Sequence, residues 1–179
     1  MPHIEIRNDL PGIRGLMADH PDTAEPLNRL AETLLRSPRS LPRGERELIA
    51  TYVSELNRTR FCSDTHGAAA AVQLEGGAEL VRAVLADPDR ADISPRLRAL
   101  LRIAAEVQEQ ARPVSDLAIA AARAQGAGDD EIHDTVLIAA AFCMYNRYVD
   151  CLATTLPAHP GYYAETGRRI VSHGYGRAA

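Results

Sequence analysis

The sequence predicts an all-α protein, and three observations support this. Apolar residues recur at helical spacing through most of the 179 residues. Alternation with a period of two, which is typical of strands, occurs only at residues 3–7. Proline, glycine and capping residues divide the chain into about seven to nine helices. We expect one helical domain over residues 1–179, with its core at about 22–156 and extensions at 1–21 and 157–179.

Prolines and glycines set the helix boundaries in the first half of the chain. Residues 8–22 have the composition of a loop with one short helix, and a helix with an apolar side follows over 24–35. X-Pro pairs end that helix, and the next is expected from about residue 43 to 57. Turn-forming residues separate it from a helix over 60–73, which adjacent glycines end. Small residues at 67–71 would let another helix approach closely.

Serine residues mark two helix starts further along the chain. A helix over residues 78–86 ends at an Asp-Pro pair. Ser94 is expected to cap the next helix, because Pro95 follows it at the first helical position. Ser115 should cap a shorter helix that ends near Gly126.

The last part of the sequence predicts a long apolar helix and a short terminal one. The long helix is expected from residue 129 to about 156, where a proline follows. One more short helix should follow residue 160, and residues 174–179 are expected to be frayed. The most apolar stretch, residues 135–144, is too short to span a bilayer.

Composition and charge exclude several classes of function. A formal net charge of −4 argues against nucleic-acid binding as the main function. Every basic side chain is arginine or histidine, so lysine-based covalent chemistry is excluded. Three cysteines without a spacing framework do not indicate a disulfide-built secreted domain, and the first residues show no signal peptide. We expect a cytoplasmic protein with neither nucleic acid nor membrane as a partner.

Cys62 and His66 are the first candidate catalytic residues. Four residues apart on a helix, they share one face at roughly 6 Å between Cβ atoms, so the imidazole can help to ionise the thiol. Cys62 also falls in the first turn of its helix, where the helix dipole favours a thiolate. Glu47 on the preceding helix could orient His66, whereas Asp64 points away from that face. The alternative is a buried structural cysteine beside a core histidine.

Neither a metal nor a cofactor is expected. Cys62 and His66 supply two ligands at helical spacing, but no second pair completes a tetrahedral set. The only adjacent glycines, at 76–77, lack the lysine of a phosphate-binding loop.

The segment from residue 46 to 70 resembles the core of the alkylhydroperoxidase AhpD / carboxymuconolactone decarboxylase superfamily. The pattern of that family is a Glu, eleven residues, Cys-x-x-Cys, three residues and a His, and it places the Glu on Glu47, the second Cys on Cys62 and the His on His66. Residues 141–150 resemble the branch described only as peroxidase-related. The resemblance implies an AhpD-like helical bundle that forms trimers or hexamers and reduces hydroperoxides with thiols.

Thr59 stands where this family has its first cysteine. In two-Cys members that residue forms a disulfide with the second cysteine after peroxide has oxidised it to a sulfenic acid. The resemblance therefore implies a one-Cys cycle, in which Cys62 is the peroxidatic thiol and another thiol resolves it. Cys151 is the possible resolving cysteine, whereas Cys143 is better explained by core packing. Phe61 replaces a second histidine of some members, so a proton relay through that position is excluded.

Three functional hypotheses follow from the sequence. The first is a hydroperoxide reductase that uses an external thiol reductant. The second is a lactone decarboxylase of the carboxymuconolactone type, which should not depend on thiolate chemistry. The third is a non-catalytic helical oligomer derived from the same fold. The reactivity of Cys62 separates the first hypothesis from the other two.

Overall fold

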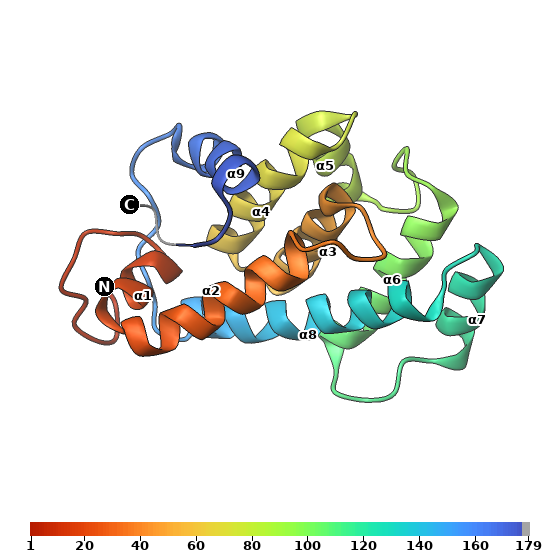
Figure 1. The fold of residues 1–179 in the computed structure, drawn as a ribbon, viewed down its shortest axis with the longest axis horizontal. Coiled ribbons are helices and arrows are strands. Elements are labelled where there is room, and N and C mark those ends of the chain that lie inside the picture. The colour runs from red at the N-terminus through yellow and green to blue at the C-terminus, as the bar shows by residue number, and fades with distance from the viewer. Residues whose placement is uncertain (177–179) are drawn as a thin grey trace.

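A computed structural model describes residues 1–176, and that range contains nine α-helices and no strand (Figure 1). The prediction of an all-α fold is therefore confirmed. The helices are α1 (Ile13–Asp19), α2 (Pro21–Leu35), α3 (Arg43–Leu56), α4 (Arg60–Gln73), α5 (Gly77–Ala86), α6 (Pro95–Glu109), α7 (Asp116–Ala124), α8 (Asp129–Asp150) and α9 (Tyr162–His173). None of the helices in this range is both long enough and apolar enough to cross a membrane.

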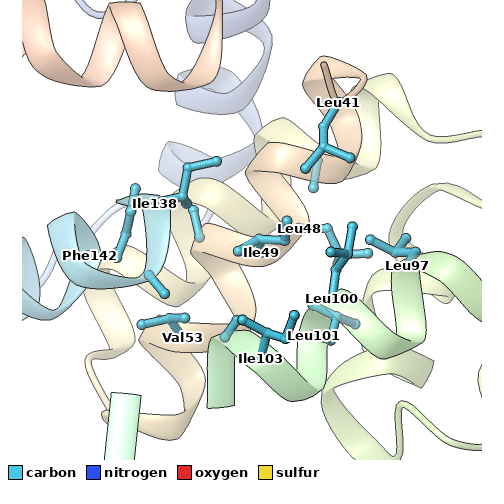
Figure 2. Close-up of a cluster of buried hydrophobic side chains, with 14 of the residues drawn as sticks. Leu41, Leu48, Ile49, Val53, Leu97, Leu100, Leu101, Ile103, Ile138 and Phe142 are labelled. Carbon is cyan, nitrogen blue, oxygen red and sulfur yellow. The ribbon is translucent and has the colours of Figure 1, made fainter. Parts of the chain in front are cut away.

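Apolar side chains of α3, α6 and α8 form the centre of the core (Figure 2). Leu48, Ile49 and Val53 of α3 are fully buried. Figure 2 shows them between α6, which supplies Leu100, and α8, which supplies Ile138. Burial of one such side chain contributes about 1.5–3 kcal/mol, so this cluster holds α3 firmly against its neighbours.

The turn between α3 and α4 folds α4 back against α3. The N–H of Arg58 donates to the carbonyl of Glu55 at 2.8 Å, and the N–H of Thr59 donates to that of Ser54 at 2.9 Å. This pair of bonds forms a Schellman motif, in which one residue takes the left-handed conformation. Arg58 takes it here with φ of 61°. The tight turn packs α4 against α3, so Cys62 and His66 lie on the helix next to the one that carries Glu47.

The long helix α8 ends at Asp150, so its predicted extension to residue 156 is wrong. A second Schellman motif ends it, with bonds from Ala153 N to Asp150 O at 2.9 Å and from Thr154 N to Val149 O at 3.4 Å. Ala153 takes the left-handed conformation with φ of 49°. Glycine usually occupies this position. Because alanine occupies it here, the sequence carries no signal for the end of the helix.

Both predicted serine caps are present. The Ser94 hydroxyl accepts a bond from the N–H of Leu97 at 3.1 Å, and the Ser115 hydroxyl accepts one from that of Ala118 at 3.2 Å. Helix α2 begins at Pro21, three residues before its predicted start at residue 24, because a proline fits the first helical turn.

The two ends of the described chain lie against the helices rather than free of them (Figure 1). The N–H of His3 donates to the carbonyl of Leu152 at 3.0 Å. After α9, which packs on α4, the N–H of Tyr175 donates to Glu32 of α2 at 2.9 Å. The expectation that residues 174–179 are frayed is therefore wrong for Tyr175, and residues 177–179 lie outside the described residues.

Candidate active site

A cavity of about 1030 Å³ lies among α1, α2, α4, α8 and α9, and both Cys62 and His66 line it. Much of its wall is apolar, with Met17, Leu27 and Phe142 among the lining side chains. The volume matches the upper end of the range for sites that bind small organic molecules, about 300–1,000 Å³. The predicted cysteine and histidine therefore face one ligand-sized space.

Glu47 holds His66 through one imidazole nitrogen. Nδ1 of His66 lies 2.9 Å from Oε2 of Glu47, and the Glu47 side chain is only 1% exposed. When Nδ1–H donates this hydrogen bond to the Glu47 carboxylate, the lone pair of Nε2 is left free. The structure thus brings Glu47 and His66 together as the sequence predicted.

Tyr175 is a third member of this array, and the sequence did not reveal it. Its hydroxyl donates to Oε1 of Glu47 at 2.5 Å and lies 3.1 Å from Nδ1 of His66. Its ring stacks on the imidazole at 5.8 Å, while Phe142 packs edge-on against the imidazole at 4.6 Å. Burial and the neighbouring Glu47 raise the pKa of Tyr175 well above its usual value, so the hydroxyl remains a donor.

The position of Tyr175 depends on the turn that ends α9. Gly174 has φ of +85°, and a Cβ on it would lie 2.4 Å from Oε2 of Glu32. Arg36, directly after α2, donates to the carbonyls of Ile170 and Val171 at 2.6 and 2.7 Å. Gly174, a glycine directly after a helix, is the one sequence signal that could have indicated a defined turn before Tyr175.

Cys62 occupies the first turn of α4, as predicted, but the structure favours its thiol rather than its thiolate. Only 3% of the residue is exposed. The pKa of Cys62 is raised to about 12, mainly by burial; a hydrogen bond with Asn146 opposes the rise, and the charge of Asp150 adds to it. No hydrogen bond joins Cys62 to His66. The expected activation by the helix dipole and the imidazole is thus outweighed by desolvation.

The rate of alkylation should differ between buried Cys62 and exposed Cys151. At pH 7, iodoacetamide is expected to modify exposed Cys151 well before Cys62, because the thiolate is the reactive form. The rate at Cys62 should then rise about tenfold per pH unit through the alkaline range, since its pKa is about 12. Peptide mass spectrometry over pH 7–10 measures both rates. Faster labelling of Cys62 than of Cys151 at pH 7 would contradict the raised pKa.

Thr59, at the position of the family's first cysteine, makes a polar contact with α8. It is 1% exposed, and its hydroxyl donates to Oδ2 of Asp150 at 2.6 Å. Next to it, the amide of Asn146 donates to the Ser54 hydroxyl at 3.0 Å. The first bond ties the start of α4 to the end of α8, where a two-Cys protein would carry its disulfide, and the second ties the end of α3 to α8.

The other two cysteines lie away from the cavity lining. Cys151 is exposed after the end of α8, and Cys143 is half-buried and packs against the main core. The sulfur of Cys143 is 3.7 Å from Nδ2 of Asn57. A resolving role for Cys151 remains a prediction. Residues 1–176 hold no group of three or more His, Cys, Asp or Glu side chains placed to bind a metal ion.

Comparison with known proteins agrees with this architecture. The sequence model of the carboxymuconolactone decarboxylase family matches residues 21–106, which include Glu47, Cys62 and His66. No functionally curated protein matches the chain.

Two crystal structures share the fold and are 25–26% identical in sequence. One is an alkylhydroperoxidase AhpD core, an uncharacterized peroxidase-related protein from Ralstonia eutropha JMP134, with a TM-score of 0.77, 26% identity, and coverage of 89% of this chain and 82% of that one. The other is an uncharacterized peroxidase-related protein from Silicibacter sp. TM1040, with a TM-score of 0.76, 25% identity, and coverage of 88% and 81%. The chain is therefore similar to the carboxymuconolactone decarboxylase family over residues 21–106, and it shares the helical fold of the AhpD core.

Proposed function

We propose that the protein is a hydroperoxide reductase in which Cys62 is the peroxidatic thiol and an external thiol is the reductant. The observation that carries this proposal is the shared cavity, which Cys62 lines together with a His66 held by Glu47 and Tyr175. A cysteine sulfur and a positioned base that face one ligand-sized space are the parts that peroxide reduction needs. The peroxidase-related names of the two similar structures support the same reaction class.

The chemical step transfers one oxygen atom to sulfur. The Cys62 sulfur attacks the terminal oxygen of R–O–O–H, so an S–O bond forms, the O–O bond breaks and RO⁻ leaves. Nε2 of His66 accepts the thiol proton and returns it to RO⁻, which departs as ROH. Because burial raises the pKa of Cys62 to about 12, the sulfur enters this step as the protonated thiol, and the step needs a base to remove that proton.

Reduction of the resulting sulfenic acid needs two thiols. The first attacks the Cys62 sulfur, which releases water and leaves a mixed disulfide. A second thiol then regenerates the Cys62 thiol and leaves as a disulfide with the first. Thr59 cannot take the part of the first thiol because a hydroxyl forms no disulfide. We assign that part to an external thiol, with exposed Cys151 as the alternative.

Substitution of Cys62 tests this function. Cys62→Ser is expected to reduce dithiol-dependent consumption of cumene hydroperoxide to the uncatalysed rate, because serine forms no sulfenic acid. Cys151→Ser is the matched control at an exposed cysteine, and it should keep the activity if an external thiol resolves Cys62. Mass spectrometry after a stoichiometric peroxide pulse should find the added oxygen on Cys62. Unchanged turnover in Cys62→Ser would disprove the mechanism.

Lactone decarboxylation is the second candidate function. The raised pKa of Cys62 favours it, because a buried thiol suits a reaction that uses only the proton chemistry of His66. The family description points in the same direction. Cys62→Ser should leave a decarboxylase active, so the same variant separates the two candidates. A protein inactive in both assays would favour the non-catalytic hypothesis.

We also assign the chain to a homo-oligomer, a trimer or a hexamer, as the family resemblance implies. Sedimentation equilibrium of the purified protein tests this assignment, and a monomer at micromolar concentration would contradict it.

A further inference from the structure

Two arginines that line the cavity form no ion pair within residues 1–176, whereas the acidic side chains of the lining do. The acidic side chains of the lining are paired: Glu25 with Arg29, and Glu32 with Arg36 at 2.9 Å. Arg14 of α1 and Arg169 of α9 also line the cavity, but neither forms an ion pair within residues 1–176. The cavity wall therefore carries uncompensated positive charge.

The two arginines lie close enough to affect each other. Burial and the charge of Arg14 both lower the pKa of Arg169. Arg169 is half-buried, and within residues 1–176 its guanidinium makes one hydrogen bond, to the carbonyl of Gly174 at 3.3 Å. Like charges held together and partly removed from water cost free energy, which a bound anion would offset.

Two hydroxyl groups of the cavity lining also lack partners among the described residues. Thr65 is 6% exposed and lines the cavity, yet its hydroxyl has no hydrogen-bond partner in the described chain. The hydroxyl of Tyr162, another lining residue, is also buried without a partner among the described residues. Buried polar groups are usually hydrogen-bonded, so orphaned hydroxyls in a cavity wall indicate a missing polar ligand.

This group of side chains is adjacent to the thiol. Tyr162 and Ile13, the residue before Arg14, pack against the small apolar cluster that contains Phe61 and Cys62. Most of the remaining cavity wall is apolar. A ligand that fits both surfaces has a charged end near the arginines and an apolar body.

We propose that Arg14 and Arg169 bind the carboxylate of an amphipathic organic acid, and that the physiological substrate is the hydroperoxide of such an acid. The substrate class rests on the proposed function, whereas carboxylate binding does not. Two guanidinium groups can share the oxygens of one carboxylate through charge-assisted hydrogen bonds. The carboxylate would hold the molecule in one orientation, with its apolar part along the wall that reaches Cys62.

Binding of an unreactive acid tests the carboxylate site without any turnover. Decanoate should bind at least about tenfold more tightly than decanol by isothermal titration calorimetry, because hydrogen bonds to charged groups contribute about 1.5–3 kcal/mol. In the double variant Arg14→Gln/Arg169→Gln this preference should disappear. Arg168→Gln is the matched control, because Arg168 is exposed beside Arg169 and does not line the cavity.

Two outcomes would overturn the carboxylate site. One is equal affinity of the wild-type protein for decanoate and decanol. The other is an equal loss of preference in Arg168→Gln and in the double variant, which would indicate a general charge effect. Far-ultraviolet circular dichroism of each variant confirms that the helices are intact.

Turnover of a matched pair of peroxides tests the substrate class. Cumene hydroperoxide carrying a para-carboxylate should have a lower KM than cumene hydroperoxide itself, and the double variant should raise only the first KM. Equal KM values in the wild-type protein would overturn the substrate class. Tight decanoate binding with no reduction of either peroxide would support the carboxylate site and refute the proposed function, so the two failures are distinguishable.

Discussion

Glu47→Gln is expected to lower kcat/KM for hydroperoxide reduction by about 10²–10⁴-fold, the usual contribution of a positioned acid–base group. Glu47 uses both carboxylate oxygens as acceptors, one for His66 and one for Tyr175. Glutamine keeps the size but offers a single oxygen, and its NH₂ group would face a neighbour that also donates. The imidazole would then lose its preferred tautomer, and with it the free lone pair on Nε2.

The effect should appear in kcat and in the spectrum of His66 rather than in the fold. Nitrogen-15 chemical shifts of His66 should change from a single tautomer in the wild-type protein to a mixture in Glu47→Gln. Tyr175→Phe removes one of the two donors to Glu47 and should give an intermediate loss of activity. A purely structural role for Glu47 would lower the free energy of unfolding without changing the tautomer.

Glu45→Gln is the matched control for this variant. Glu45 lies on the same helix two residues earlier and pairs with Arg96 at 3.3 Å, but it does not line the cavity. Its activity should remain within about twofold of the wild-type value, since Glu45 pairs with Arg96 and contacts neither His66 nor Tyr175. Comparable losses in both variants would show that Glu47 acts through the general charge of α3 and not through His66.

The Glu47–His66 pair was predictable because its determinants are local. Helical spacing places Cys62 and His66 on one face of α4, and a tight turn returns α4 against α3, which carries Glu47. The turn itself required a left-handed Arg58, which no glycine marked in the sequence. A short connection between two amphipathic helices was enough to predict their contact without its detailed geometry.

The environment of Cys62 was not predictable because distant segments create it. The side chains that bury its thiol come from Ile13 near the N-terminus, Val149 at the end of α8 and Tyr162 at the start of α9. Sequence reasoning weighed the helix dipole and His66, both local, and therefore expected a thiolate. Desolvation by these three segments raises the pKa instead.

Tyr175 was missed for a similar reason. It lies 128 residues from Glu47 in the sequence, and its contact depends on the packing of α9 against α4. Near a chain end, a tyrosine among small residues carries no periodic signal. Its fixed place follows from tertiary contacts with α2, which local patterns do not encode.

Gly167→Ala should destabilise the protein by about 1–3 kcal/mol, although helix propensity alone predicts the opposite sign. Alanine inside a helix is favoured over glycine by about 0.5–1 kcal/mol. At Gly167, however, a Cβ would lie 2.7 Å from the backbone carbon of Ala68 and 2.8 Å from its Cβ. Backbone cannot rotate away as a flexible side chain can, so α9 must move from α4. Urea denaturation measures the change in the free energy of unfolding.

The displacement of α9 should also impair the site, because α9 carries Arg169 and leads into Tyr175. We expect Gly167→Ala to lose both hydroperoxide turnover and the preference for decanoate. Gly128→Ala is the control, since a Cβ there meets nothing within 4 Å and Gly128 does not line the cavity. A stabilised Gly167→Ala protein would show that α9 adapts without cost. In that case the close contact between Gly167 and the small residues of α4 would not determine the position of α9 over the cavity.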